Sequence, residues 1–157
     1  MRHRRVLLSL LAVLALVAGG CSAGSDASTK AAGTSSVATT APAAGRPLFI
    51  NMTTDDSHRA NMALSFGQKQ QALGHPLTVF LNDRGVFVGS TDNAAKYEMH
   101  QKMISAIIAA GGTVLACPMC TEHYGVKPDT YVKGVKMGNP ELTGGKLFEN
   151  GSVTLTW

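Results

Sequence analysis

The sequence lacks the features that mark several large functional classes. It has no basic stripe interleaved with aromatic side chains, which a nucleic-acid surface would need. It has no phosphate-binding glycine loop, no serine-hydrolase elbow and no metalloprotease helix motif. No internal repeat is apparent, and only three cysteines occur in 157 residues. A nucleic-acid partner therefore has no support. The informative features that remain are the N-terminus and the cysteines.

The N-terminus reads as a targeting segment. Three arginines precede an apolar run over residues 6–18, which is too short to span a bilayer comfortably. The run ends in Ala18-Gly19-Gly20-Cys21, which resembles the lipobox of a lipoprotein signal peptide. We therefore expect residues 1–20 to be removed and Cys21 to carry a lipid that inserts in the bilayer, on the outer face of the cytoplasmic membrane. The alternative is an ordinary secretory signal in which Cys21 is incidental.

Residues 21–46 have a different composition, dominated by Ser, Thr, Ala and Gly. Such a stretch buries too little apolar surface to offset its ordering entropy, so we expect a flexible tether. Three of the 14 basic residues belong to the expected signal peptide, which leaves 11 basic against 10 acidic residues. Residues 47–157 remain as one nearly neutral domain, which is large enough to form a single hydrophobic core without disulfide or metal cross-links.

Short apolar runs alternate with helical patterns through this domain. We expect strands at 47–53, 77–81, 113–117 and 153–157, and helices at 58–73, 97–110 and 140–148. Between them, 84–95 predicts an irregular loop with a short helix or turn, and 132–137 a brief strand or turn. Strands that alternate with helices indicate right-handed crossovers. The predicted fold is therefore α/β, with three α/β/α layers and a mainly parallel sheet of four to five strands.

The apolar residues of the two long helices predict which faces are buried. In the first helix the stripe consists of Ala60, Ala63, Leu64 and Gly67, widened by Met62, Phe66 and Leu73. In the second helix it consists of Met99, Met103, Ala106, Ile107 and Ala110. Asp55 and Asp56 precede the first helix, where capping is their simplest role.

In parallel sheets the working residues gather beyond the carboxyl ends of the strands. Residues 53–57, 82–84 and 117–123 each follow a predicted strand, and we expect them to converge. The strongest chemical candidates are Cys117 and Cys120, with His123 one turn further on. A cysteine thiolate is the nucleophile for disulfide exchange or for accepting sulfur as a persulfide. Cys120 then resolves an intermediate or locks Cys117 in a disulfide, and His123 supplies charge or a proton relay if it faces the pair.

Other readings of this motif stay open. The pair could be a purely structural disulfide. A c-type haem is disfavoured because Thr121 stands where that motif needs His, and the second half of a zinc site is missing. Copper(I) is an alternative, because four suitable ligands lie close together in the sequence. They are Cys117, Met119, Cys120 and His123.

The sequence resembles the DsrE/DsrF-like family of small sulfur-relay proteins. The segments that carry the resemblance are Leu48-Phe49-Ile50-Asn51, residues 76–82, Cys117 with Gly125, residues 134–142 and residues 153–156. The resemblance implies a flavodoxin-like domain that forms trimers or hexamers. It also implies a persulfide carried at the position of Cys117, with no cofactor beyond the sulfur itself.

One departure from the family bears on function. Its sulfur-relay members work in the reducing cytoplasm, whereas a lipid-anchored member faces an oxidising space. Our first hypothesis is therefore an extracytoplasmic protein that handles sulfane sulfur or exchanges disulfides through Cys117 and Cys120. The sulfur or thiol donor and acceptor are unknown. The second hypothesis is a binding protein without turnover, for copper(I) or a protein partner, and a structural subunit of a membrane-surface assembly is a third.

Overall fold

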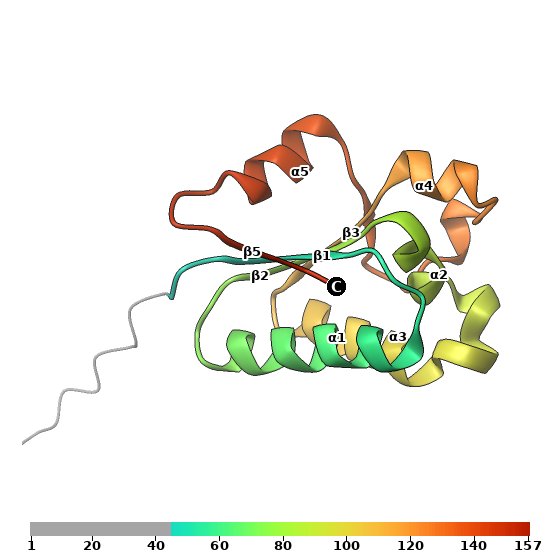
Figure 1. Ribbon diagram of the computed structural model, residues 1–157, viewed down its shortest axis with the longest axis horizontal. Coiled ribbons are helices and arrows are strands. Elements are labelled where there is room, and N and C mark those ends of the chain that lie inside the picture. Colours follow the sequence, from blue (N-terminus) through green and yellow to red (C-terminus); the bar gives the residue numbers. More distant parts are fainter. Residues whose placement is uncertain (1–44) are drawn as a thin grey trace, which may run out of the picture. The chain divides into compact units, whose positions relative to one another are not determined.

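The computed structural model describes residues 45–157, so the expected signal peptide, Cys21 and nearly all of the tether lie outside the described residues. The described chain forms a five-stranded parallel sheet in the order β4-β3-β2-β1-β5, with helices on both faces (Figure 1). The strands are β1 Leu48–Met52, β2 Leu77–Leu81, β3 Thr113–Ala116, β4 Lys136–Met137 and β5 Val153–Thr156. This is the predicted three-layer α/β/α, flavodoxin-like arrangement.

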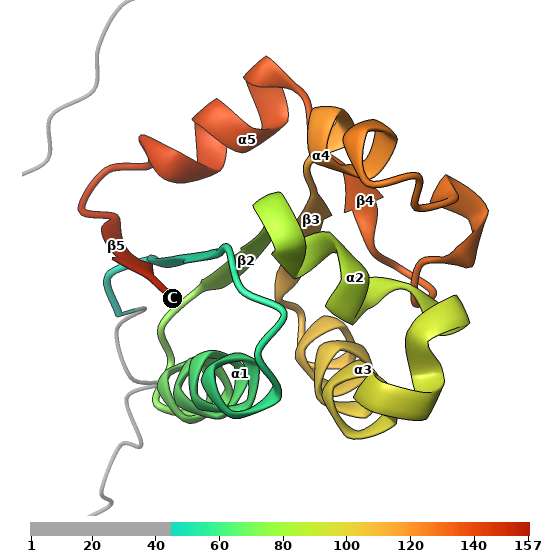
Figure 2. The ribbon, with the colours of Figure 1, turned by 45° about the vertical axis from the view of Figure 1, so that its right-hand side comes forward.

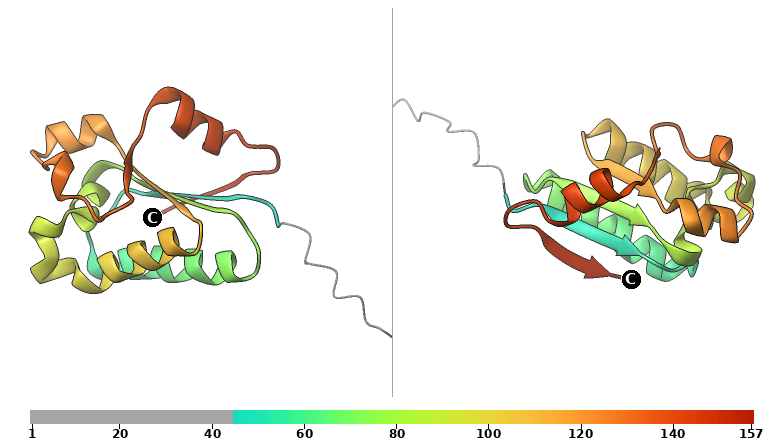
Figure 3. Two further views of the ribbon diagram at one scale, coloured as in Figure 1. Left: turned by 180° about the vertical axis from the view of Figure 1, so that it is seen from behind. Right: turned by 90° about the horizontal axis from the view of Figure 1, so that it is seen from above.

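The connections place the helices on opposite faces of the sheet. Helices α1 (Ser57–Ala72) and α3 (Ala94–Ala109) link β1 to β2 and β2 to β3 on one face. The chain then returns from β4, at one edge, to β5, at the other edge, through α5 (Pro140–Leu147) on the second face (Figures 2 and 3). The short helices α2 (Val86–Gly89) and α4 (Pro118–His123) follow the carboxyl ends of β2 and β3. Three-residue 3₁₀ turns begin at Asp83, Thr91 and Pro128.

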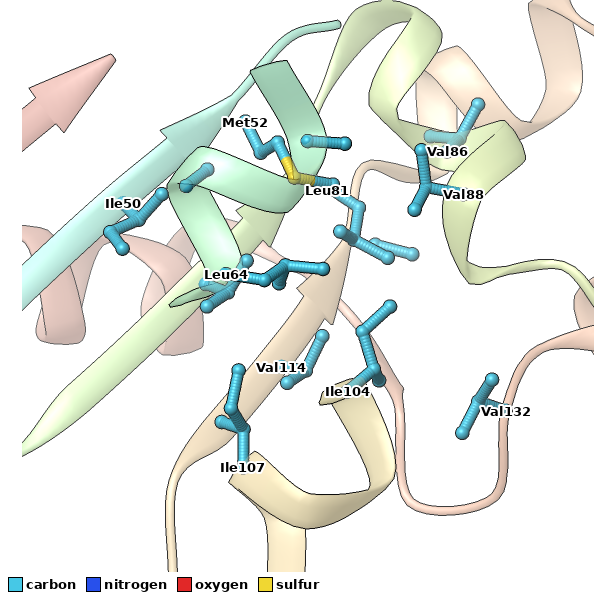
Figure 4. Packing of buried hydrophobic residues seen from close by; sticks show 14 of the residues in the cluster. Ile50, Met52, Leu64, Leu81, Val86, Val88, Ile104, Ile107, Val114 and Val132 are labelled. Atoms are coloured by element: carbon cyan, nitrogen blue, oxygen red, sulfur yellow. The ribbon is translucent and has the colours of Figure 1, made fainter. Parts of the chain in front are cut away.

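The main core lies between the sheet and the helices α1 and α3 (Figure 4). Alternate strand residues point to this side, and the parallel register sets Ile50 beside Val79 and Val79 beside Val114. These side chains and those of Leu64 and Ile104 are almost fully buried. The period of two along each strand meets the helical period of the facing helices, so that one face of each strand packs against α1 and α3.

The second face of the sheet is covered less completely. Phe49 and Phe80 point to it, with ring centroids 6.2 Å apart. Helix α5 lies over this face, but none of its own residues is buried. Space therefore remains between α5 and the sheet. Within residues 45–157, no helix is both long and apolar enough to cross a membrane.

The first helix buries the predicted stripe but not its widened edge. Ala60, Ala63, Leu64 and Gly67 are buried. Met62, Phe66 and Leu73 are exposed, with Leu73 70% accessible. Phe66 packs against Trp157, next to the edge strand β5, with ring centroids 5.9 Å apart. The prediction was wrong here because α1 packs against β1, β2 and α3, and these three residues lie outside those contacts.

The second helix buries only part of its predicted stripe: Ile107 is buried and Met103 packs against the core, whereas Ala106 and Ala110 are exposed. It begins at Ala94, and the backbone of Tyr97 departs from helical geometry (φ −122°, ψ 15°). The residues buried after that break are Tyr97, His100, Gln101, Ile104 and Ile107. Met99 was predicted on the buried side but is 63% accessible. The break changes which side of the helix faces the core. Hydrophobicity alone could not reveal this, because two of the buried residues, His100 and Gln101, are polar.

Candidate functional site

Cys117 stands at the carboxyl end of β3. Its backbone N–H donates to the carbonyl of Leu81 on β2 (2.9 Å), so the residue is fixed to the end of the sheet. Its extended backbone makes it the N-cap of α4, and Pro118 occupies the first helical turn, where a missing N–H costs nothing. The backbone N–H of Cys120 points to Cys117 Sγ at 3.4 Å. The Cys-Pro-x-Cys sequence thus turns a strand directly into a helix, with the first sulfur at the junction.

The second cysteine lies one helical turn further and faces the first. The two Sγ atoms are 2.7 Å apart, and both cysteines are free thiols that are partly accessible. No backbone movement is needed for one sulfur to reach the other. The pair can therefore exchange between a dithiol and a disulfide, and either sulfur can attack a group bound to its neighbour.

Residues at the end of β2 hold the Cys120 sulfur from the other side. The Asp83 N–H donates to Cys120 Sγ at 3.2 Å, and Asn82 Oδ1 lies 3.2 Å from the same sulfur. The single S–H hydrogen of Cys120 thus has two acceptors, Asn82 Oδ1 and Cys117 Sγ. Asp83 has a positive φ of 44°, a conformation that aspartate tolerates better than most residues. Its N–H is shared between the sulfur and Asn82 Oδ1, which lies 2.9 Å away.

The surroundings make the two thiols chemically different. Burial, followed by the hydrogen bond with Cys117, raises the pKa of Cys120 to about 11. Cys120 therefore keeps its proton at neutral pH and acts as a hydrogen-bond donor. A protonated thiol is a poor nucleophile. Cys117 is thus the sulfur placed to react first, and Cys120 the sulfur placed to react second.

Three hydroxyl groups hold α4 in position. Thr121 Oγ1 donates to the carbonyl of Cys117 (2.7 Å) and pairs with the hydroxyl of Tyr131 (2.7 Å). The Tyr124 hydroxyl donates to the Asp83 carboxylate, and this hydrogen bond raises the pKa of Tyr124. These contacts connect the helix that carries Cys120 to the turn that holds its sulfur.

The predicted convergence of three strand ends is confirmed. Arg84, after β2, forms a bidentate pair with Asp55, after β1, with both N–O distances 2.8 Å. The hydrogen bond from Arg84 lowers the pKa of Asp55. The Arg84 guanidinium also lies over the ring of Tyr124 at the end of α4. Helix capping, by contrast, falls to Asp56 alone, which accepts from the Arg59 N–H at 2.9 Å.

His123 and Met119, two other predicted candidates, lie at the surface. The His123 ring packs edge-on against Tyr124, with centroids 4.8 Å apart. Among the contacts of the described chain it has no hydrogen bond to either thiol, so its catalytic role stays a prediction. Met119 is 79% accessible. Residues 45–157 hold no group of three or more His, Cys, Asp or Glu side chains arranged for a metal ion. Copper(I) binding likewise stays a prediction.

Sequence reasoning missed part of the site. Asn82 and Asp83 fell inside a segment that was expected to contribute, since polar residues directly follow a buried strand. Tyr124 and Tyr131 were not singled out. Tyr131 lies in an irregular stretch with no periodic pattern, and only the folded chain brings its hydroxyl to Thr121.

Comparisons with known proteins agree with this architecture. A model of the DsrE/DsrF-like family matches residues 47–147. A protein of unknown function from Methanobacterium thermoautotrophicum has a TM-score of 0.60 at 17% identity, covering 72% of this chain and 100% of its own. The ychN protein from E. coli has a TM-score of 0.54 at 18% identity, with coverages of 72% and 100%. A conserved protein of unknown function from Bacteroides thetaiotaomicron has a TM-score of 0.57 at 22% identity, with coverages of 71% and 95%. No curated protein matches the chain.

Proposed function

The chain belongs to the DsrE/DsrF-like family, and from that premise we propose that it carries sulfane sulfur as a persulfide on Cys117, with Cys120 as the resolving thiol. The observation that carries the proposal is the thiol pair at the end of β3. Its sulfur atoms lie 2.7 Å apart, and the pKa of Cys120 is raised to about 11. In such a pair, one sulfur can act as the nucleophile and the other can later displace the group bound to it.

The chemistry has two steps. The Cys117 thiolate attacks the outer sulfur of a persulfide R–S–SH, so that a Cys117 S–S bond forms, the S–S bond of the donor breaks and the thiolate R–S⁻ leaves. An acceptor thiolate then removes the outer sulfur by the same kind of attack and regenerates Cys117. If no acceptor arrives, Cys120 loses its proton to water as its sulfur attacks Cys117 Sγ, forms the intramolecular disulfide and releases hydrosulfide. The disulfide then needs an external dithiol as reductant.

The location is part of the proposal. The lipobox-like sequence before Cys21 supports a lipid-anchored protein outside the cytoplasm. In that oxidising space the disulfide of Cys117 and Cys120 is a resting state that the cytoplasmic members of the family avoid. The same two cysteines would carry out thiol–disulfide exchange when no sulfane sulfur is bound to Cys117. The trimeric or hexameric assembly implied by the family also stays a prediction.

Mass spectrometry of persulfide loading tests the function. The full chain carrying Cys21→Ser, which has only the two site thiols, is reduced and exposed to inorganic polysulfide, thiosulfate and an organic persulfide. We expect one added sulfur atom on the peptide that contains Cys117.

Two variants serve as matched controls for this measurement. Cys117→Ser should accept no sulfur from any donor. Cys120→Ser should load and then keep its sulfur longer, because no internal thiol displaces it. Sulfur loading that persists in the folded Cys117→Ser protein would refute the proposal.

A further inference from the structure

Cys117 borders a groove that contains no charged residue. Two adjoining hollows, of about 200 and 290 Å³, lie on the second face of the sheet near α5. Both are lined by Phe80 and Thr143, so they form one groove. The first hollow reaches Cys117 and Met119, and the second extends over Phe49 on β1. No Asp, Glu, Lys, Arg or His side chain lines either hollow.

The three asparagines of the groove are partly engaged within the protein. Asn139 Oδ1 caps α5 by accepting from the Leu142 N–H at 2.7 Å. Asn82 Nδ2 donates to Asn51 Oδ1 at 3.2 Å. What the groove offers a ligand is therefore mainly apolar surface, from the two phenylalanines, Met119 and neighbouring prolines. An apolar group gains roughly 25 cal/mol per Å² when it leaves water for such a surface.

Three charged groups near the thiols line a separate hollow. Arg84, Lys96 and Asp55 line a space of about 250 Å³ on the side of Tyr97. The Arg84 guanidinium is already paired with Asp55 through two 2.8 Å contacts. A sulfur oxyanion that approached Cys117 through the neutral groove would lose hydration without meeting a cation. Burying an unpaired charge is costly, so the groove selects against such donors.

The shape of the groove decides between a small molecule and a polypeptide. A bound peptide normally pairs its backbone N–H and C=O groups, most often along the free edge of a sheet. This groove lies on the face of the central strands, whose backbone groups are already paired within the sheet. A peptide backbone would have few partners there. The two hollows together fall in the size range of small-molecule pockets, about 300–1,000 Å³.

We propose that this groove binds the apolar substituent of a low-molecular-weight organic persulfide or disulfide and presents its sulfur to Cys117. This inference rests on the proposed role of Cys117 as nucleophile and adds the substrate class. In the reaction, the Cys117 thiolate forms a bond to the sulfur nearest it, the S–S bond of the substrate breaks, and the departing thiolate takes up a proton from water. No further oxidant or reductant takes part.

Reaction rates with methanethiosulfonates test the groove directly. The Cys117 thiolate displaces methanesulfinate from each reagent and forms a mixed disulfide, which stays trapped in the full chain carrying Cys21→Ser and Cys120→Ser. The probes are the benzyl, sulfonatoethyl and trimethylammonioethyl reagents, and each rate constant is divided by the rate constant of free cysteine. We expect the normalised rate for the benzyl probe to be at least ~10-fold higher than for either charged probe, which corresponds to about 1.4 kcal/mol.

A charge placed in the groove provides the matched comparison. Thr143→Lys should reduce the benzyl advantage over the anionic probe several-fold. Ala109→Lys, on α3 at the opposite face of the sheet, should leave it unchanged. Equal or faster normalised rates with a charged probe would overturn the inference even without the variants. A cysteine peptide disulfide that reacts faster than the benzyl probe would overturn the small-molecule assignment.

The outcome is separable from that of the proposed function. Efficient persulfide loading from thiosulfate together with no benzyl preference would remove the groove assignment and leave the carrier function. A clear benzyl preference without persulfide loading from any donor would support the groove and remove the carrier function.

Discussion

Gly85 holds the turn that carries Asn82 and Asp83 close to the end of β1, and replacing it with alanine should disturb both the fold and the site. Its backbone (φ −57°, ψ −21°) is one that alanine adopts freely. At an open position of this kind, Gly→Ala stabilises by about 0.4–1 kcal/mol through the entropy of the unfolded chain. Any destabilisation must therefore come from contacts. A Cβ at Gly85 would lie far inside van der Waals contact with the Met52 carbonyl oxygen and 3.0 Å from its carbon.

The magnitude follows from these contacts. A normal carbon–oxygen contact is about 3.3–3.6 Å, so the turn must move away from β1. Overpacking costs about 1–3 kcal/mol, and the hydrogen bond from the Asn82 N–H to the Met52 carbonyl (2.9 Å), once weakened, costs about 1 kcal/mol more. After the entropic gain is subtracted, Gly85→Ala should destabilise the protein by about 2 kcal/mol. For a domain of this size that lowers Tm by about 8 °C.

The assay for Gly85→Ala combines stability with reactivity. Urea unfolding and thermal melts give the free energy of unfolding and Tm. Iodoacetamide labelling should show Cys120 reacting faster than in the parent, because the turn no longer holds its sulfur. Gly144→Ala is the matched control, since a Cβ at Gly144 on α5 meets nothing within 4 Å. That control should be stabilised by about 0.5–1 kcal/mol. A Gly85→Ala protein at least as stable as the parent would refute the reasoning.

Two further predictions concern pH. In the Cys21→Ser/Cys117→Ser protein, the rate of Cys120 alkylation should rise with pH, with a midpoint between pH 9 and 11. Burial still raises the pKa of Cys120 in this variant, while the contribution of Cys117 is lost. A midpoint at or below the usual cysteine pKa of ~8.5 would contradict this. Asp55→Asn should cost about 0.5–1 kcal/mol at pH 7 by removing the pair with Arg84. Because the folded pKa of Asp55 is lowered, this stability is present above the unfolded value of about 3.9 and is lost as pH falls through the folded pKa. The two unfolding free energies should therefore converge in acid, and a gap that widens there would argue against the ion pair.

The fold was predictable because its signals are local and repeated. Four apolar runs of strand length alternate with helical patterns, and β1 and β2 are buried along most of their length, as in a parallel sheet that is covered on both faces. The faces of the helices were less predictable. Met99 and Leu73 are as hydrophobic as core residues, yet tertiary position leaves both exposed. No pattern in α1 reveals which of its hydrophobic residues face the sheet and α3.

The sequence predicted which segments form the site, but not the contacts within it. The motif located Cys117 and Cys120, and the strand ends located Asn82 and Asp83. Which sulfur keeps its proton depends on burial and on three hydrogen-bond directions that no spacing encodes. The uncharged groove depends on α5 lying over Phe80, a contact between residues more than sixty positions apart. Such properties exist only once the chain is folded.

The parallel direction of the strands separates the two ends of the domain. The described chain enters at Gly45, before β1, where its N–H bonds the carbonyl of Gly74 just ahead of β2. Cys117 follows β3 at the opposite end of the sheet, and a strand of five residues spans about 16 Å at roughly 3.3 Å each. The thiols therefore lie at the end of the domain opposite to the end at which the described chain begins. If Cys21 is anchored as proposed, the largest distance of the thiols from the membrane is set by the length of the tether plus the length of the strands. The local concentration of the protein would be highest for molecules that pass just above the bilayer, not for those within it.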